Sequence, residues 1–292
     1  EMKLRFGEML NDTGDKSRGD DGPAVSIYTA NLRSAKATLK YILKGSKEGE
    51  SFHPSMTFFG FQYCEITASE DIEVLSLTGE VVGSATEEGA SFVTSSSSIN
   101  QLYSNVMWGQ RGNYLSIPTD CPQRDEKMGW TGDAQIFAET ACLNMECYPF
   151  FRKYLHDIAL EQEETKGLVP QIVPFVGRNE RTSAACGDAT VTNPGKLYEI
   201  YGDTSILEEQ YESMKEWISY IDSENRRNGT NPNLWENGFH YGDWLALDGG
   251  CYHMPTGGTD VFYVSSAYFY YSTSLLAKAA EVLGKSEGAR YY

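Results

Sequence analysis

The sequence predicts a multidomain α and β protein, in which an N-terminal β-sandwich is followed by part of a helical toroid. Short β-branched and aromatic runs, separated by Gly, Ser and Pro, fill residues 3–90 and are typical of strands. From Ile99 onward, apolar residues recur at helical spacing. The polar run 94–98 separates the two patterns, so we expect domains at 1–94 and 95–292.

The composition favours a neutral partner. The chain of 292 residues is 40% hydrophobic, which suffices for a folded core, and its formal net charge is −17. Such a charge repels polyanions, so we expect neither nucleic acid nor an anionic membrane surface as a partner. Acidity that serves solubility alone is an equally good explanation of the charge. No apolar run reaches the length of a membrane span.

The cysteines predict a reducing compartment. No Cys-x-x-Cys pair or regular spacing occurs among Cys64, Cys121, Cys142, Cys147, Cys186 and Cys251. In a chain of this length, such scattered residues are typical of free thiols. The N-terminus lacks a signal-peptide pattern. We therefore expect a cytoplasmic protein.

The N-terminal region is expected to be structural, because no cluster of residues within it calls for chemistry. Its strands are predicted at 3–10, 40–44, 56–59, 61–66 and 72–77. The Gly- and Asp-rich segment 11–23 is predicted to form turns.

The C-terminal region predicts helices joined by long loops. Ser98 is expected to cap the first helix, and Pro194 to interrupt the fourth. Helices are predicted from about 99 to 107 and at 133–145, 150–164, 188–201, 205–223 and 261–283. Helix pairs with loops that build a site at one end are typical of half a toroid, although no internal repeat is strong enough to establish it.

The stretch 118–133 is the strongest functional signal. It holds the four carboxylates of Asp120, Asp125, Glu126 and Asp133 beside Trp130. Its prolines favour extended backbone and its glycines allow positive φ, which together predict an ordered, irregular loop. Carboxylates repel one another, so their gathering beside an aromatic wall indicates acid–base chemistry on a sugar.

Asp120, Glu126 and Asp133 are the first candidates for that chemistry. A glycosidase needs one carboxylic acid to protonate the departing oxygen and a second carboxylate as base or nucleophile. Arg124 could hold one carboxylate ionised, and Asp125 is expected to turn away from its neighbour. For Asp133, the helix dipole is an alternative explanation. For Glu126, simple surface exposure is equally plausible.

Two later motifs repeat the pattern of Asp beside Gly. They are Gly187-Asp188-Ala189 and Tyr241-Gly242-Asp243-Trp244. Each alone is ordinary turn chemistry, and a tryptophan is more often buried in a core than stacked on a sugar. His240 and His253 are expected to be structural. No pattern of ligands indicates a metal, and we expect no cofactor.

The run Asp120-Cys121-Pro122-Gln123-Arg124-Asp125-Glu126, with Gly129-Trp130-Thr131-Gly132-Asp133, resembles the signature of bacterial α-L-rhamnosidases of glycoside hydrolase family 78. The likeness covers nearly the whole chain. Phe59-Gly60-Phe61-Gln62-Tyr63 is similar to the family's Gly-Phe-Arg-Tyr strand, and the two Gly-Asp motifs match later landmarks.

This resemblance implies a six-hairpin glycosidase: an (α/α)6-barrel behind a β-sandwich, which hydrolyses terminal α-L-rhamnosides with inversion. It makes rhamnose-containing glycosides the expected partners. Glu126 takes the position of the general acid. The substrate-binding positions that it implies are Asp120, Arg124, Trp130, Asp133, Asp188, Asp243 and Trp244.

Two departures from the family pattern stand out. Cys186 takes the place of an expected aromatic residue, which would widen the pocket or alter aglycone preference. The family's general base, a glutamate of the later barrel half, has no counterpart, so we expect a fragment of a longer enzyme. The alternatives are a catalytically incomplete fragment that only binds sugar or self-associates, and another helical-toroid glycosidase or lyase.

Overall fold

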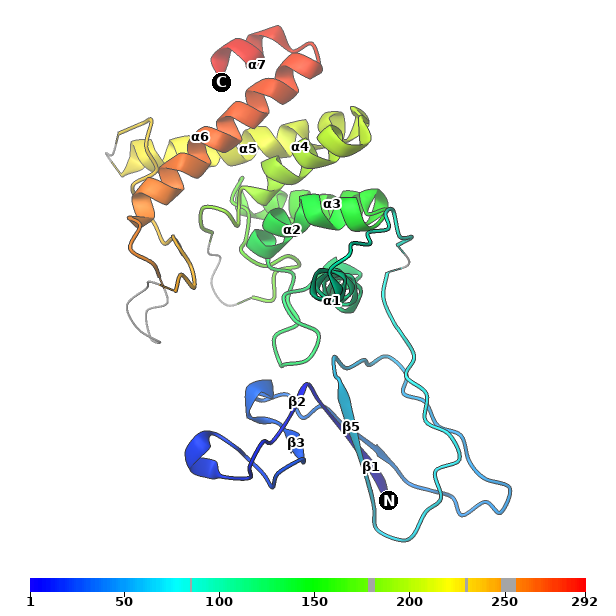
Figure 1. Ribbon diagram of the computed structural model, residues 1–292. Coiled ribbons are helices and arrows are strands. Elements are labelled where there is room, and N and C mark those ends of the chain that lie inside the picture. Colours follow the sequence, from blue (N-terminus) through cyan, green and yellow to red (C-terminus); the bar gives the residue numbers. More distant parts are fainter. Residues whose placement is uncertain (85, 178–181, 229–230, 248–255) are drawn as a thin grey trace. The chain divides into compact units, whose positions relative to one another are not determined.

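The strands and the helices occupy different parts of the chain. A computed structural model describes residues 1–84, 86–177, 182–228, 231–247 and 256–292 (Figure 1). Its contacts form two compact units. The sheet unit comprises Glu1–Gly83, Trp108–Leu115 and Thr119–Lys127, and the helical unit comprises Ser84–Met107, Ser116–Pro118 and Met128–Tyr292. The division of the chain into domains at 1–94 and 95–292 stays a prediction.

The sheet unit is built around β1 (Met2–Gly7), the central strand of a three-stranded antiparallel sheet. It pairs with β4 (Thr38–Tyr41) on one side and β5 (Tyr63–Ala68) on the other, with Leu4 opposite Leu39 and Ile66. Because side chains alternate along a strand, Leu4 and Phe6 both enter the small core. The remaining elements are β2 (Met9–Leu10), β3 (Ile27–Tyr28) and the 3-10 helices η1 (Lys16–Arg18) and η2 (Ala30–Leu32).

Two of the predicted strands are wrong. Residues 56–59 and 72–77 form no strand, and the side chains of Val74, Leu75 and Leu77 are exposed. A strand is stable only when a neighbour pairs with its backbone and covers its apolar face. Neither condition is met within this part of the described chain, so its β-type composition is not enough. The segment predicted as turns ends just before the unpredicted strand β3.

All six predicted helices are present, with shifted ends. The helical elements are α1 (Ser97–Asn113), α2 (Thr131–Asn144), α3 (Tyr148–Thr165), α4 (Ala189–Tyr201), α5 (Ser205–Arg227), α6 (Val261–Val282) and α7 (Ser286–Tyr291), and a short β6 (Tyr114–Leu115) and β7 (Ile117–Pro118) pair follows α1. Ser98 lies inside α1 and therefore does not cap it. Pro194 lies within α4 without ending that helix.

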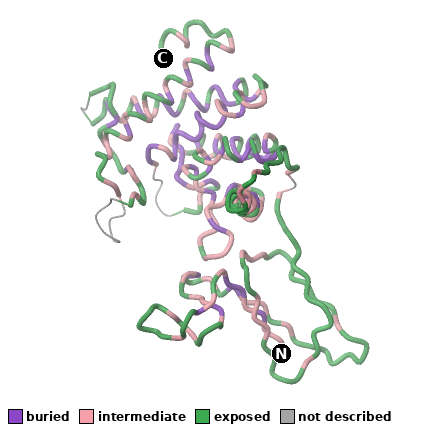
Figure 2. The backbone as a smooth tube through the Cα atoms, in the orientation of Figure 1, coloured by how far each residue is buried: buried purple, intermediate pink, exposed green. Residues whose placement is uncertain are grey.

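The helical unit is held together by apolar faces that meet between helices. α4 contacts α2, α5 and α6, and α3 contacts both α4 and α5. The inner face of α5 carries Met214, Trp217 and Ile221, all fully buried, and the buried backbone in Figure 2 concentrates in α3, α4 and α5. Such a face follows from apolar residues at helical spacing.

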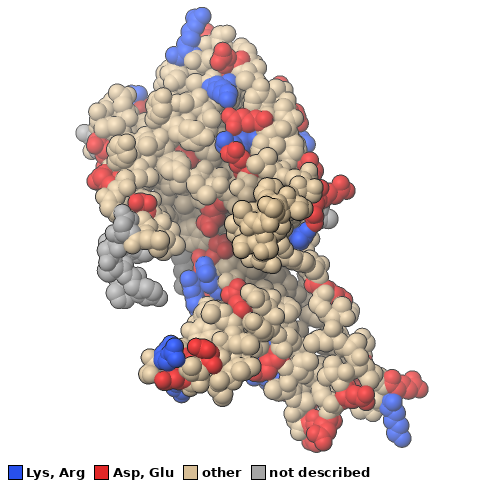
Figure 3. All heavy atoms as spheres, in the orientation of Figure 1, with Lys and Arg blue, Asp and Glu red and all other residues tan. Residues whose placement is uncertain are grey.

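A sheet-containing unit followed by a helical unit confirms the coarse prediction for the fold. Among the described helices, none is long and apolar enough to cross a membrane. Acidic and basic side chains are interspersed on the face drawn in Figure 3.

Candidate active site

One arginine joins two carboxylates of the motif loop. Arg124 donates from Nη2 to Asp120 Oδ2 and from Nε to Glu126 Oε2, each at 3.1 Å. The Asp120 side chain is 7% exposed and that of Glu126 is 18% exposed. Burial alone lowers the pKa of Arg124, but Cys121, Glu126 and Asp120 together raise it above its ordinary value. The guanidinium is therefore a permanent cation between two carboxylates.

The neighbouring Asp125 points to a different partner. It accepts hydrogen bonds from the backbone N–H of Ser34, at 3.3 Å, and from the Ser34 hydroxyl. The hydroxyl bond lowers the pKa of Asp125. Glu126 instead accepts a second arginine, with Arg33 Nη1 at 2.9 Å from Oε2. The two adjacent carboxylates thus have different hydrogen-bond partners.

The loop contains groups that can bind a cation, but its two carboxylates already form ion pairs with Arg124. Among the described residues, Asp120, Cys121 and Glu126 each present a ligand atom within 4.8 Å of the others. The Arg124 guanidinium bonds both carboxylates and would repel a metal ion. Burial also raises the pKa of the Cys121 thiol, which disfavours the thiolate that metals bind. We assign no metal to this cluster.

The start of α2 is fastened to the loop that follows α3. Thr131 donates from its backbone N–H to the carbonyl of Gln171 at 2.9 Å. The carbonyl of Gly129 accepts from Tyr154 Oη and from the backbone N–H of Val173, both at 2.9 Å. A Cβ at position 129 would lie 2.1 Å from the Val173 carbonyl oxygen, so this close approach requires glycine. These contacts fix Trp130, whose extended backbone precedes the helix.

Three aromatic rings form a row in the helical unit. Tyr241 lies edge-on to Trp130 with ring centroids 6.1 Å apart, and to Trp244 at 5.0 Å. Its hydroxyl donates to Gln171 Oε1 at 2.7 Å, which ties the row to the loop that anchors α2. Trp244 is half exposed. The predicted site does not include Tyr241, although this residue directly precedes the Gly-Asp-Trp motif.

Asp133 and Asp243, the other predicted acidic residues of the helical unit near the surface, differ in surroundings. Asp133 lies in the first turn of α2 and is exposed. Asp243 accepts from Thr259 Oγ1 at 3.2 Å, and its backbone carbonyl accepts from Gly257 N–H at 2.7 Å. A Cβ at position 257 would lie 2.3 Å from Asp243 Oδ2, so Gly257 leaves room for that carboxylate.

Asp188 lies in the interior of the helical unit, away from any exposed surface. It is 0% exposed and accepts from Trp217 Nε1 at 3.0 Å, Ser272 Oγ at 2.6 Å and Ala185 N–H at 2.8 Å. Burial raises its pKa, against the effect of these donors. A carboxylate already saturated by protein donors is poorly placed to bind a sugar hydroxyl. The preceding Gly187 lies against the Trp217 ring, so this motif locks α4, α5 and α6 together.

Cys186 and His240 are also interior residues. Cys186 is 5% exposed, and burial raises its pKa to about 11. That Cys186 widens the substrate pocket or alters the aglycone preference stays a prediction. His240 accepts from Ala184 N–H at 3.0 Å and its Nε2 lies 2.9 Å from the Asn237 carbonyl, which fits a neutral ring and a structural role. The described cysteines are free thiols, whereas Cys251 and His253 lie outside the described residues.

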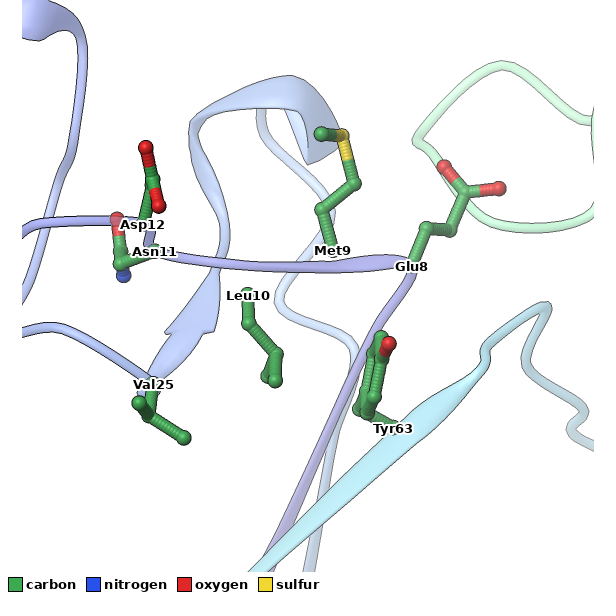
Figure 4. Close-up of a pocket in the computed structure, with 7 residues that line it drawn as sticks. All are labelled: Glu8, Met9, Leu10, Asn11, Asp12, Val25 and Tyr63. Carbon is green, nitrogen blue, oxygen red and sulfur yellow. The ribbon is translucent and has the colours of Figure 1, made fainter.

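Two surface pockets contain none of the predicted site residues. The first, of about 430 Å³, is in the sheet unit and is lined by Glu8, Met9, Leu10, Asn11, Asp12, Val25 and Tyr63. Figure 4 shows the side chains of Leu10 and Val25 near one another, whereas those of Glu8, Met9 and Asp12 point to the other side of the segment 8–12. The second, of about 420 Å³ in the helical unit, has walls from Tyr220, Trp235 and Phe239.

Paired carboxylates are the groups that glycoside hydrolases use for acid and base catalysis. The model of the bacterial α-L-rhamnosidase 6 hairpin glycosidase domain matches residues 87–292, and that of the bacterial α-L-rhamnosidase concanavalin-like domain matches residues 1–83. The chain therefore belongs to the bacterial α-L-rhamnosidases of glycoside hydrolase family 78.

Individual relatives agree with this membership. The chain is 37% identical to an α-L-rhamnosidase of Formosa agariphila and 38% identical to one of Streptomyces avermitilis, and it spans 30% and 25% of their lengths. It matches the crystal structure of an α-L-rhamnosidase from Aspergillus terreus with a TM-score of 0.86 at 33% identity, covering 100% of this chain and 32% of that one. The Streptomyces avermitilis enzyme complexed with L-rhamnose gives a TM-score of 0.82 at 38% identity, covering 97% of this chain and 25% of that one.

Proposed function

We propose that the full-length protein hydrolyses terminal α-L-rhamnosides with inversion, and that Glu126 is the general acid. The observation that carries the proposal is the Asp120–Arg124–Glu126 cluster, which occupies the family's motif and lies on an irregular loop. The relatives are named α-L-rhamnosidases, and one of them was crystallised with L-rhamnose.

In this proposal Glu126 protonates the oxygen of the departing aglycone. Arginine partners favour a carboxylate, whereas a proton donor must carry a proton. We infer that sugar hydroxyls bound between Asp120 and Arg124 draw the guanidinium away from Glu126 and expel water. Glu126 is then free to take up its proton before the bond breaks. The general base is not among the predicted residues, and its place in a later part of the family's helical domain rests on the resemblance alone.

The remaining predicted residues divide by their surroundings. Trp130, Tyr241 and Trp244 are proposed to form the apolar wall against one face of the sugar ring. Asp133 and Asp243 are proposed to bind sugar hydroxyls, since Asp133 is exposed and Asp243 is not fully buried. Asp188 is reassigned as a positioning residue, because three protein donors already occupy its carboxylate.

The finer architecture is also a proposal. Contacts of α2 with α4 and of α4 with α6 form one series, and those of α3 with α5 form a second, which supports inner and outer layers of an (α/α)6 toroid. The small sheets are proposed to be part of the β-sandwich of the family. Free thiols support the expected cytoplasmic location. The proposed reaction needs no cofactor.

The direct test is hydrolysis of an aryl α-L-rhamnoside by the full-length protein, followed by ¹H NMR from the first turnover. The proposal expects the β-anomer of L-rhamnose to appear first and to mutarotate afterwards. A parallel panel of aryl glycosides of other sugars tests the substrate class. Initial release of the α-anomer would refute inversion, and a faster reaction with another sugar would refute the substrate assignment.

A second candidate for the 292-residue chain is self-association. Large apolar side chains are exposed on three helices of the helical unit: Leu102 on α1 is 62% exposed, Ile136 on α2 69%, and Tyr270 on α6 77%. Exposed apolar surface promotes association between copies. Sedimentation velocity of this chain is expected to give species larger than a monomer, and a single compact monomer at micromolar concentration would contradict it.

A further inference from the structure

Two consecutive residues of the sheet unit hold two consecutive residues of the motif loop. Arg33 Nη1 donates to Glu126 Oε2 at 2.9 Å, and Ser34 donates twice to Asp125 Oδ2, from its backbone N–H at 3.3 Å and from its hydroxyl. All four residues belong to the sheet unit. The contacts join positions 93 and 91 residues apart, so neither partner can be inferred from the motif itself.

The backbone that presents Arg33 is unusual. Arg33 follows η2 and has φ 56° and ψ −117°, in the region that residues with a side chain avoid. Its position is fixed from both sides: Leu32 is 1% exposed in the sheet core, and Ala35 N–H donates to the Leu32 carbonyl at 3.1 Å. A strained residue persists where the surrounding structure holds it, and such residues concentrate at functional sites.

We infer that Arg33 is a positioning residue for Glu126, and that Ser34 assists it by fixing the adjacent Asp125. The segment around residues 33 and 34 then contributes to orienting the proton donor and to setting its pKa. This inference rests on the proposed role of Glu126.

The groups around Glu126 define how Arg33 acts. They include the guanidinium groups of Arg33 and Arg124, the Asp120 carboxylate that shares Arg124, and the Cys121 sulfur. Lys127 is directed elsewhere, with Nζ 3.1 Å from the Phe58 carbonyl oxygen. Each guanidinium favours the ionised glutamate. Loss of Arg33 removes one of these two guanidinium groups, so Glu126 should keep its proton to higher pH. Its carboxyl group should also be less well oriented toward the departing oxygen.

The test uses the full-length protein with Arg33→Gln, Arg33→Lys and Ser34→Ala. The matched control is Arg5→Gln, which removes another arginine–glutamate pair of the sheet unit, Arg5 Nε to Glu65 Oε1 at 3.6 Å. The readout is kcat/KM against pH for two aryl α-L-rhamnosides, one with an activated leaving group and one with a poor leaving group. Protonation by the acid matters most for the poor leaving group, and the basic limb of the profile reports loss of its proton.

The expected results separate positioning from general stability. Arg33→Gln should move the basic limb upward by about 0.5–1 pH unit, a modest shift because the Arg33 side chain is 56% exposed. It should also lower kcat/KM at the optimum by about 3–30-fold for the poor leaving group, and less for the activated one. Arg33→Lys should keep the basic limb near its original pH but lower kcat/KM several-fold. Ser34→Ala should lower kcat/KM more for the poor leaving group than for the activated one. Arg5→Gln should change neither the position of the limb nor kcat/KM.

An unmoved limb and unchanged rates in a folded Arg33→Gln variant would overturn the inference. If Arg33→Gln does not fold, the test rests on Arg33→Lys. Wild-type kcat/KM for both leaving groups would then overturn the inference, and a fall in kcat/KM confined to the poor leaving group would support it. Glu126→Gln is assayed in parallel. Near-normal activity of Glu126→Gln would overturn the proposed function, whereas an inactive Glu126→Gln beside a wild-type-like Arg33→Gln would overturn only the role of Arg33.

Discussion

Gly187→Ala should strongly destabilise the helical unit, although it adds only one methyl group. The new Cβ would lie 2.1, 2.4 and 2.6 Å from Cη2, Cζ2 and Cζ3 of Trp217. Carbon atoms pack at about 3.5–4.0 Å, so the indole must move by more than about 1 Å. The ring has no room to do so, because it is fully buried, stacks on Tyr220 at 5.7 Å and meets Trp235 edge-on at 5.5 Å.

The cost has two parts. Overpacking of a buried side chain costs about 1–3 kcal/mol. Displacement of Trp217 also breaks its hydrogen bond to the buried Asp188, and bonds to charged groups contribute about 1.5–3 kcal/mol. We therefore expect a loss of about 2.5–6 kcal/mol in the free energy of unfolding.

Urea unfolding of the full-length protein, followed by tryptophan fluorescence, measures this loss. The matched control is Gly195→Ala in the neighbouring α4, where a new Cβ would meet Leu275 at an ordinary 3.7 Å. There, replacement of a helical glycine should leave stability unchanged or raise it by up to about 1 kcal/mol. A loss below about 1 kcal/mol for Gly187→Ala would refute the account of this motif as a packing lock.

Two further predictions concern the aromatic row and the sheet unit. Trp244→Ala should raise KM for an aryl α-L-rhamnoside by about 3–10-fold with a smaller change in kcat, since stacking contributes about 0.5–1.5 kcal/mol. The control Trp108→Ala, which removes a comparably exposed tryptophan from α1, should leave KM unchanged. Equal KM values for both variants would contradict the proposal that Trp244 stacks on the sugar. The backbone N–H groups of Lys44 and Ser46 and the Tyr41 hydroxyl lower the pKa of Glu50 from 4.5 to about 2. Because the pKa of Glu50 is lower in the folded state, Glu50 stabilises the sheet unit above pH 4.5 and loses this effect as pH falls toward 2. The difference in unfolding free energy between wild type and Glu50→Gln should therefore shrink as pH falls through that window. A difference that does not depend on pH would refute this prediction.

The sequence predicts the helices better than the strands, for a physical reason. An amphipathic helix carries its own hydrogen bonds and shows its buried face in its spacing, so α3, α5 and α6 all begin within a few residues of their predicted starts. A strand depends on a distant partner, and the apolar residues of 72–77 find none within the described chain.

The candidate site follows the same rule. The Asp120–Arg124–Glu126 cluster is local in sequence, and the motif predicts that Arg124 pairs with one of its carboxylates, whereas the arginine bonds two. Arg33 reaches Glu126 across 93 residues, and no local pattern reveals such a contact. Asp188 looked like a sugar contact because burial cannot be inferred from a Gly-Asp pair, whereas its surroundings are those of an interior carboxylate.

The most direct test of the central claim is the rate of Glu126→Gln in the full-length protein, measured with aryl α-L-rhamnosides of differing leaving-group pKa. Glutamine keeps the shape and the arginine contacts at one oxygen but cannot donate a proton to the departing oxygen. The proposal predicts a fall in kcat/KM of about 10²–10⁴-fold for the poor leaving group and a smaller fall for the activated one. Activity within a few-fold of wild type for both substrates would contradict the assignment of Glu126 as the general acid.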